Sequence, residues 1–221
     1  SDYFSALISF NNKENTNALK FFNSSKSLIN RHDSFLQNYV KSLVIEGKVS
    51  RGIQEVKYAL NDKSSDFFEA YLLLIVESLK KNEIEKSKKY LNQILKFKEK
   101  GTYEFVIYHS LKSYISLFDE KKLSLDNEAL GSLSLINQAF QSCYLGKANT
   151  EAKFINLINH NDIDYSRYIF FYINYLISKN RLSDAEEITN NINILDSSII
   201  IQQAKSWIEK GNSNKIEKIF S

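Results

Sequence analysis

The chain has 221 residues, of which 43% are hydrophobic, and its 29 basic and 26 acidic side chains give a net charge of +3. This apolar content argues against a disordered chain, and the near balance of charge argues against a nucleic-acid binder, which would need clustered Lys and Arg. The single cysteine excludes an intramolecular disulfide framework, and the absence of proline lets helix follow helix without a forced break.

Residues that tolerate a positive φ angle recur along the chain at regular intervals. Gly47, Gly146 and Gly211 are separated by 99 and 65 residues, close to three and two multiples of 33. Where the same spacing calls for a turn but glycine is absent, the chain has asparagine, at Asn12, Asn82 and Asn180. Glycine and asparagine suit the left-handed residue that ends many helices. A period of about 33 to 34 residues is typical of helical repeat proteins, so the sequence predicts a stack of helical hairpins.

Three hairpins are predicted in the first half of the chain. The first runs from about residue 3 to 28 and turns near Asn12. The second covers 34–60, where apolar residues at helical spacing flank a turn at Gly47. The third covers 66–95 and turns at Asn82. Each predicted helix has one apolar stripe, as stacking requires.

A less regular segment follows. Residues 102–118 have a helical pattern, but the return helix would fall in 119–134, which contains Gly131 and several Ser, Asp and Asn residues. We expect a short or irregular helix there, and a soft boundary between an N-terminal lobe, 1–118, and a C-terminal lobe, 135–221.

Three further hairpins are expected in the C-terminal lobe, with turns at Gly146, Asn180 and Gly211. The last one stops about two turns into its return helix. Because a solenoid normally ends in a polar capping element, this predicts that the natural protein continues.

No catalytic, cofactor or metal site is predicted. His32, His109 and His160 lie far apart in the sequence, and none has a His or Cys at metal-ligand spacing. The Asn and Asp residues of 160–164 lack the glycine and distal glutamate of a calcium loop. Phosphate-binding glycine motifs are missing, as are runs of about 18 apolar residues that could span a membrane. We therefore expect a non-enzymatic protein.

Two hairpins carry a pattern of apolar and small residues at Leu36, Tyr39, Leu43, Gly47, Ile53, Ala59 and Leu60, and at Ile173, Leu176, Ala185 and Ile192. In these residues the chain resembles the tetratricopeptide repeat family. The resemblance implies an all-α fold, an α-solenoid of stacked antiparallel hairpins wound as a right-handed superhelix, forming a single array over 1–221. Gly52 and Ser87 depart from it, since alanine is usual at their positions in the second helix.

The resemblance also implies that the first helix of each hairpin lines a concave groove that binds a peptide, a helix or another protein. Carried onto this chain, it places sixteen side chains in the groove: Tyr3, Leu7, Phe10, Gln37, Lys41, Val44, Leu72, Val76, Leu79, Asn137, Gln141, Tyr144, Arg167, Phe170, Asn174 and Ile177. Leu72 and Val76 stand where a carboxylate clamp would need polar groups. An apolar or amphipathic ligand, such as a helix, is therefore expected.

Three functions remain open at this point. The preferred one is a protein-binding scaffold. A carrier of a small hydrophobic ligand would instead need an enclosed apolar pocket of some hundreds of Å³. A recruiting or regulatory arm of a larger enzyme would need catalytic motifs elsewhere in a longer protein. Similarity to envelope-associated bacterial repeat proteins favours the periplasm or cell envelope over the cytoplasm.

Overall fold

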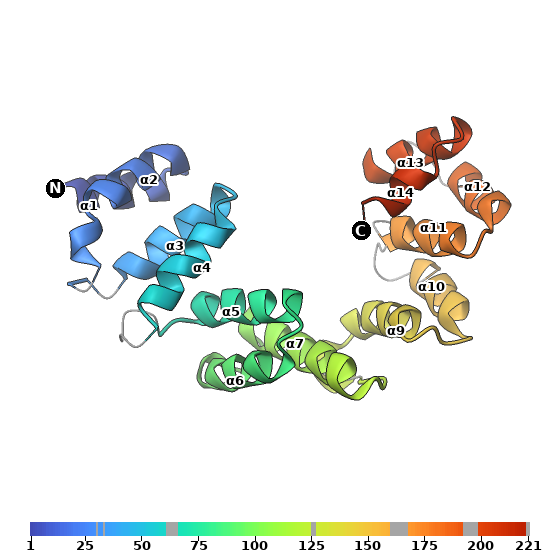
Figure 1. Cartoon of the computed structure of the whole chain (residues 1–221), viewed down its shortest axis with the longest axis horizontal. Helices are drawn as coiled ribbons and strands as arrows, with labels where there is room; N and C mark the ends of the chain where they lie inside the picture. Colours follow the sequence, from blue (N-terminus) through green and yellow to red (C-terminus); the bar gives the residue numbers. More distant parts are fainter. Residues whose placement is uncertain are drawn as a thin grey trace. The chain divides into compact units, whose positions relative to one another are not determined.

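The computed structural model describes residues 1–29, 31–32, 34–60, 66–124, 127–159, 168–191 and 199–219. In this part of the chain every regular element is a helix (Figure 1), which confirms the all-α prediction. The chain forms two compact units, residues 1–119 and residues 120–221. None of the described helices is long and apolar enough to cross a membrane.

Unit 1 contains three helix pairs and one longer helix. The pairs are α1 (Asp2–Asn11) with α2 (Asn15–Ser24), α3 (Phe35–Ile45) with α4 (Val49–Tyr58), and α5 (Phe68–Lys80) with α6 (Ile84–Ile94). Short 3₁₀ helices follow α2, at Lys26–Leu28, and α6, at Leu95–Phe97. The longer helix is α7 (Tyr103–Glu120).

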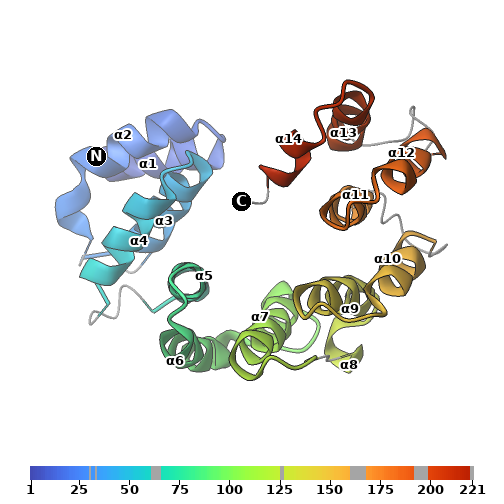
Figure 2. The same ribbon diagram turned by 45° about the vertical axis from the view of Figure 1, so that its right-hand side comes forward.

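Unit 2 repeats the pairing with shorter final elements. After the four-residue α8 (Asn127–Leu130), α9 (Leu133–Tyr144) packs against α10 (Thr150–Ile158), and α11 (Ile169–Ser178) packs against α12 (Leu182–Asn191). The last pair is α13 (Ile199–Glu209) with α14 (Asn214–Glu217). Figure 2 shows α11, α12 and α13 in succession, and contacts join each of them to the other two.

Six of the described helices end in the same hydrogen-bonded turn. After α3, for example, the amide of Gly47 donates to the carbonyl of Val44 at 3.0 Å, and the amide of Lys48 donates to the carbonyl of Leu43 at 2.8 Å. These two bonds define a Schellman motif, which needs a left-handed residue at its fifth position. The six left-handed residues all have φ between 57° and 71°: Lys13, Gly47, Asn82, Gly146, Asn180 and Gly211.

Five of the six turns therefore lie at the residues predicted for them, and the first prediction is wrong by one residue. Asn12 has φ −78° and still belongs to the α1 end, whereas the left-handed residue is Lys13, at φ 63°. The reason is that α1 continues through Asn11, so the fifth position of the motif falls on the lysine.

Three apolar clusters form the interior of unit 1. The first joins α1, α2 and α3 around Phe22, whose ring contacts those of Tyr3, Phe35 and Tyr39 at centroid distances of 5.5 to 6.4 Å. The second joins α3, α4 and α5, and the third joins α5, α6 and α7. Each helix pair of unit 1 thus shares an apolar cluster with the helix that follows it.

Unit 2 has one continuous core that reaches from α9 to α14. Phe154 on α10 stacks on Tyr172 of α11 at 5.5 Å, and Phe140 on α9 meets Phe171 edge-on at 4.7 Å.

Small residues let the two helices of a pair approach closely. Four of them are buried, each four residues after the end of its turn motif: Ala18, Gly52, Ser87 and Ala185. Gly52 and Ser87 take the place that alanine holds in the other two helices.

Candidate interaction surface

The first three predicted groove residues pack in the core. Tyr3 is only 8% exposed, and its ring stacks on Phe35 at 5.1 Å and on His32 at 4.9 Å. Leu7 and Phe10 are partly buried against the same cluster. These side chains leave little surface for a partner, because the apolar face of α1 is needed to hold α2 and α3.

Gln37 and Lys41 are brought together by Glu69. The amide of Gln37 donates to Glu69 Oε2 at 3.1 Å, and Lys41 Nζ lies 3.0 Å from Glu69 Oε1. These contacts tie α3 to α5. Val44, one turn further along α3, is 37% exposed.

The three candidates on α5 are placed differently from one another. Leu72 and Leu79 are partly buried against the third cluster. Val76 lies on the same stripe of the helix, one turn after Leu72, but is 46% exposed. It is therefore available to a ligand, whereas the two leucines support the fold.

In unit 2 the candidates are mostly interior. Phe170 and Ile177 belong to the core, and Gln141 exchanges two hydrogen bonds with the backbone of Ser124, at 2.8 and 2.9 Å. The buried Asn137 Nδ2 and Asn174 Oδ1 have no hydrogen-bond partner among the described residues. The remaining candidates are Tyr144, which is exposed and accepts a hydrogen bond from Lys121 at 2.7 Å, and Arg167, which lies outside the described residues.

A cleft of about 700 Å³ lies between the start of α4 and the end of α5. Val49, Ile53 and Val76 supply its apolar lining, and Val49 and Val76 are 39% and 46% exposed. Its volume is within the range of ligand sites in proteins. Of the sixteen candidates, Val76 alone lines this cleft.

The charged lining of this cleft is organised around Glu77. The carboxylate of Glu77 accepts contacts from Lys57 on α4 at 2.6 Å and from Lys81 at 2.7 Å. Burial raises the pKa of Glu77, but the hydrogen bonds and charges of the two lysines outweigh it, so the pKa lies below its ordinary value. Glu77 is therefore ionised at neutral pH and keeps both lysines at the cleft.

A second cleft, of about 470 Å³, lies on the other side of α4, against the 3₁₀ helix Lys26–Leu28. Gln54 lines both clefts. Next to it, Tyr58 is 95% exposed, which is unusual for a large aromatic side chain. We call the two clefts, with Val49, Ile53, Gln54, Lys57, Tyr58, Val76 and Lys80 in their lining, the α4 groove.

The lysine-rich segment 80–100 is largely engaged within the chain. Lys86 and Lys88 pair with Glu83 and Glu85, and Lys88 also pairs with Asp119 at 2.8 Å. Lys96 contacts Asp66, and Lys98 lies over the Tyr108 ring at 4.6 Å from its centroid. These lysines are held within the chain, whereas Lys80 at the start of the segment has no partner among the described residues.

The structure offers little reactive chemistry in its described residues. Burial raises the pKa of the half-buried Cys143 thiol, which keeps it protonated at neutral pH. No three His, Cys, Asp or Glu residues of the described part are grouped as metal ligands. The arrangement can bind a ligand by apolar contact and charge.

The α4 groove lies outside the predicted partner surface, because that prediction used only the first helix of each hairpin. The groove residues of α4 lie on the second helix of the α3–α4 hairpin: Val49, Ile53 and Tyr58. A signal was present: α4 buries Gly52 and Val56 on one face, so the exposed Val49 and Tyr58 are surplus to its inward stripe.

The comparisons with known proteins give no relative. No family model matches the chain, and neither a curated protein nor a solved structure matches it.

Proposed function

We propose that this chain is a non-enzymatic protein-interaction scaffold, in which the helical hairpins form an α-solenoid of tetratricopeptide type. The α4 groove is the part of its surface that binds a partner segment. The observation that carries the proposal is the cleft between α4 and α5, in which Val49 and Val76 stay more than one third exposed.

The groove suits an extended or helical segment. Its lining mixes aliphatic side chains with lysines, a glutamate and an amide, so a ligand would need both apolar and polar groups. Amphipathic helices that lay an apolar face in a hydrophobic groove are a recurring mode of peptide recognition. A carrier of a purely hydrophobic small molecule would need an enclosed apolar lining, which neither cleft has.

Selection from a displayed library of random peptides against the purified chain tests this proposal. Enriched peptides are synthesised with a fluorescent label, and their affinity is measured by fluorescence anisotropy. Val76→Asp should weaken binding by at least about tenfold, because it places a charge on the apolar lining. Circular dichroism of the variant should match that of the parent chain, since Val76 is 46% exposed.

Ile45→Asp is the matched control. Ile45 is an aliphatic residue of the same unit that is 65% exposed and does not line the groove. Peptides should bind this variant as they bind the parent. Failure to enrich any peptide, or equal binding by the Val76→Asp and Ile45→Asp variants, would refute the proposed function.

A further inference from the structure

The cleft between α4 and α5 carries positive charge that its own acidic residue does not cancel. Lys57, Lys80 and Lys81 line it together with a single glutamate, so three positive charges face one negative charge and the surplus is two. Glu77 is held between Lys57 and Lys81 and neutralises one of them. The remaining surplus includes Lys80.

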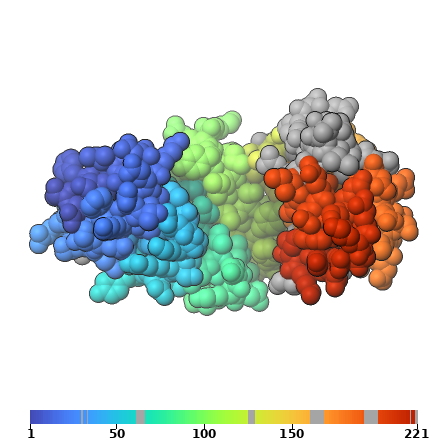
Figure 3. Space-filling view, turned by 90° about the horizontal axis from the view of Figure 1, so that it is seen from above, coloured from blue at the N-terminus to red at the C-terminus, as the bar shows by residue number. Residues whose placement is uncertain are grey.

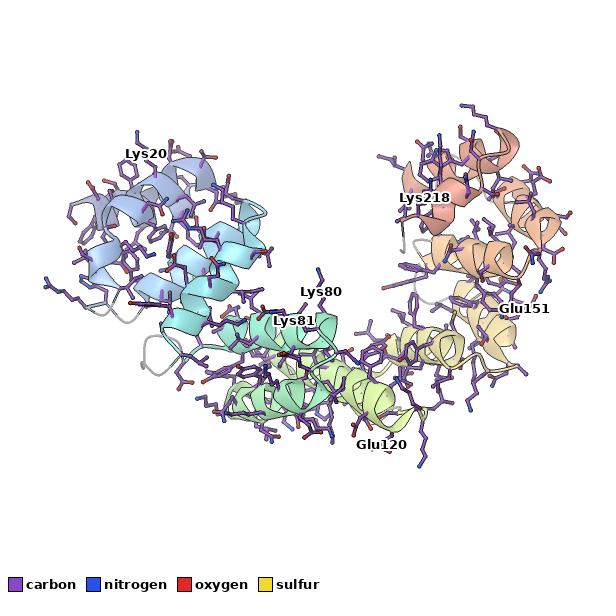
Figure 4. The ribbon with its side chains drawn as sticks, in the orientation of Figure 1. Lys20, Lys80, Lys81, Glu120, Glu151 and Lys218 are labelled. Carbon is purple, nitrogen blue, oxygen red and sulfur yellow. The ribbon has the colours of Figure 1, made fainter. Side chains whose placement is uncertain are left out.

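Lys80 is the cation most open to an incoming ligand. It has no ion-pair or hydrogen-bond partner among the described residues, whereas Lys57 and Lys81 share Glu77. Figure 4 shows the Lys80 side chain standing clear of the ribbon at the end of α5. A carboxylate placed beside it would gain a charged hydrogen bond without having to displace an existing partner.

The apolar and charged groups lie close enough to be contacted together. Val76 and Lys80 are four residues apart on α5 and so share one face of that helix, opposite Val49 and Ile53 of α4. In the space-filling view, α4 in cyan lies beside α5 in blue-green at the surface of unit 1 (Figure 3). A ligand in the cleft therefore meets an aliphatic wall with lysines at its edge.

The length of the groove favours a peptide over a small molecule. On α4 the lining of the cleft against α5 runs from Val49 to Lys57. At a rise of 1.5 Å per residue this part of α4 extends over roughly 12 Å. Two to three turns of a helix, or about four residues of an extended chain, match that length.

We propose that the α4 groove binds an amphipathic segment of a partner protein that carries acidic side chains beside its apolar ones. The apolar residues fill the space against Val49, Ile53 and Val76, and a carboxylate pairs with Lys80. This inference rests on the proposed function and specifies the chemistry of the partner.

The peptides enriched in the library selection test the inference through their charge. They should carry a net negative charge and at least two apolar residues. For each peptide, a charge-reversed version with every Asp and Glu replaced by Lys should bind the parent chain at least about tenfold more weakly. Affinity for the acidic peptide should also fall as sodium chloride is raised.

Charge reversal on the protein supplies the decisive comparison. Lys80→Glu should weaken binding of the acidic peptide by about tenfold and strengthen binding of the charge-reversed peptide. Lys20→Glu is the matched control, since Lys20 is an exposed lysine on α2 that also has no partner among the described residues and stands clear of the ribbon (Figure 4). It should leave both affinities unchanged.

Each contrary outcome identifies what has failed. Enriched peptides that require Val76 but are neutral or basic, or equal effects of Lys80→Glu and Lys20→Glu, would overturn the acidic partner and leave the proposed function standing. Sedimentation showing that the chain self-associates, with loss of the dimer in the Val76→Asp variant, would assign the groove to a second copy. Displacement of the peptide by micromolar dodecanoate would assign it to a small amphiphile.

Discussion

Two glycines of the α3–α4 hairpin have opposite backbone requirements. Gly47 has φ +71°, which an L side chain rarely adopts, whereas Gly52 lies inside α4 with ordinary helical geometry. A Cβ added at Gly52 would meet Val40 and Val44 at 3.7 Å, which is ordinary van der Waals contact. One glycine is therefore required by its conformation, and the other is only tolerated.

Gly52→Ala should stabilise the chain by about 0.5–1 kcal/mol, because alanine has the better helix propensity and less freedom when unfolded. Gly47→Ala should destabilise it by about 1 kcal/mol or more, since alanine is strained in the left-handed region. Urea unfolding followed by circular dichroism measures both. Shifts of the same sign in the two variants would contradict this assignment.

The sequence predicted these turns well because a left-handed residue limits the choice of amino acid. Glycine and asparagine stand out in a sequence, and five predicted turns lie where the structure has them. Lys13 could not be found in this way, since lysine carries no preference for that conformation. Its position depends on where α1 ends, which the packing of α1 on α2 decides.

Between elements, a polar cluster clamps three helices of unit 1. The buried Tyr39 of α3 donates from its hydroxyl to Asn23 Oδ1 of α2 at 2.8 Å. Arg51 of α4 donates to the same two oxygens, at 2.8 and 2.7 Å. The hydroxyl thus joins α2 and α4 through the helix that lies between them.

Tyr39→Phe should lower the free energy of unfolding by about 1 kcal/mol, because the ring stays in the core while two hydrogen bonds are lost. Thermal unfolding followed by circular dichroism measures this loss. Tyr90→Phe on α6 serves as the control, since its half-buried hydroxyl has no hydrogen-bond partner among the described residues. Equal losses in the two variants would show that the clamp contributes nothing.

At this scale the sequence predicted that helices exist but not which faces remain open. Apolar periodicity marks a stripe on α5, and the stripe includes both Leu72, which packs on the core, and Val76, which does not. The difference depends on the neighbouring helices, since Leu72 packs against the third cluster whereas Val76 lines the cleft toward α4. Contacts such as those of Glu69 with Gln37 and Lys41 likewise depend on neighbouring hairpins and have no signature within one helix.

For the molecule as a whole, the two units have separate cores and should respond separately to a core substitution. The chain has a single tryptophan, Trp207, which packs against the core of unit 2. Circular dichroism reports on the helices of both units, whereas Trp207 fluorescence reports on unit 2. Comparing the two signals therefore shows which unit unfolds.

Phe22→Ala should destabilise unit 1 by about 3–5 kcal/mol, because it removes a fully buried ring from the first cluster. In urea, circular dichroism should show an earlier loss of part of the helix signal, while the fluorescence midpoint of Trp207 stays unchanged. Leu157→Ala, a fully buried residue of unit 2, should shift the Trp207 midpoint instead. A Trp207 midpoint that moves in the Phe22→Ala variant would mean that the units unfold together.

The two hydrogen bonds that define each of the six Schellman turns join main-chain atoms, so neither of them uses the side chain at the left-handed position. Three of these positions hold lysine or asparagine, residues that adopt this conformation at a cost of up to roughly 1 kcal/mol relative to glycine. The stability of the folded chain can therefore be raised at three positions, Lys13, Asn82 and Asn180. Glycine at these turns would raise the melting temperature without altering any residue of the α4 groove.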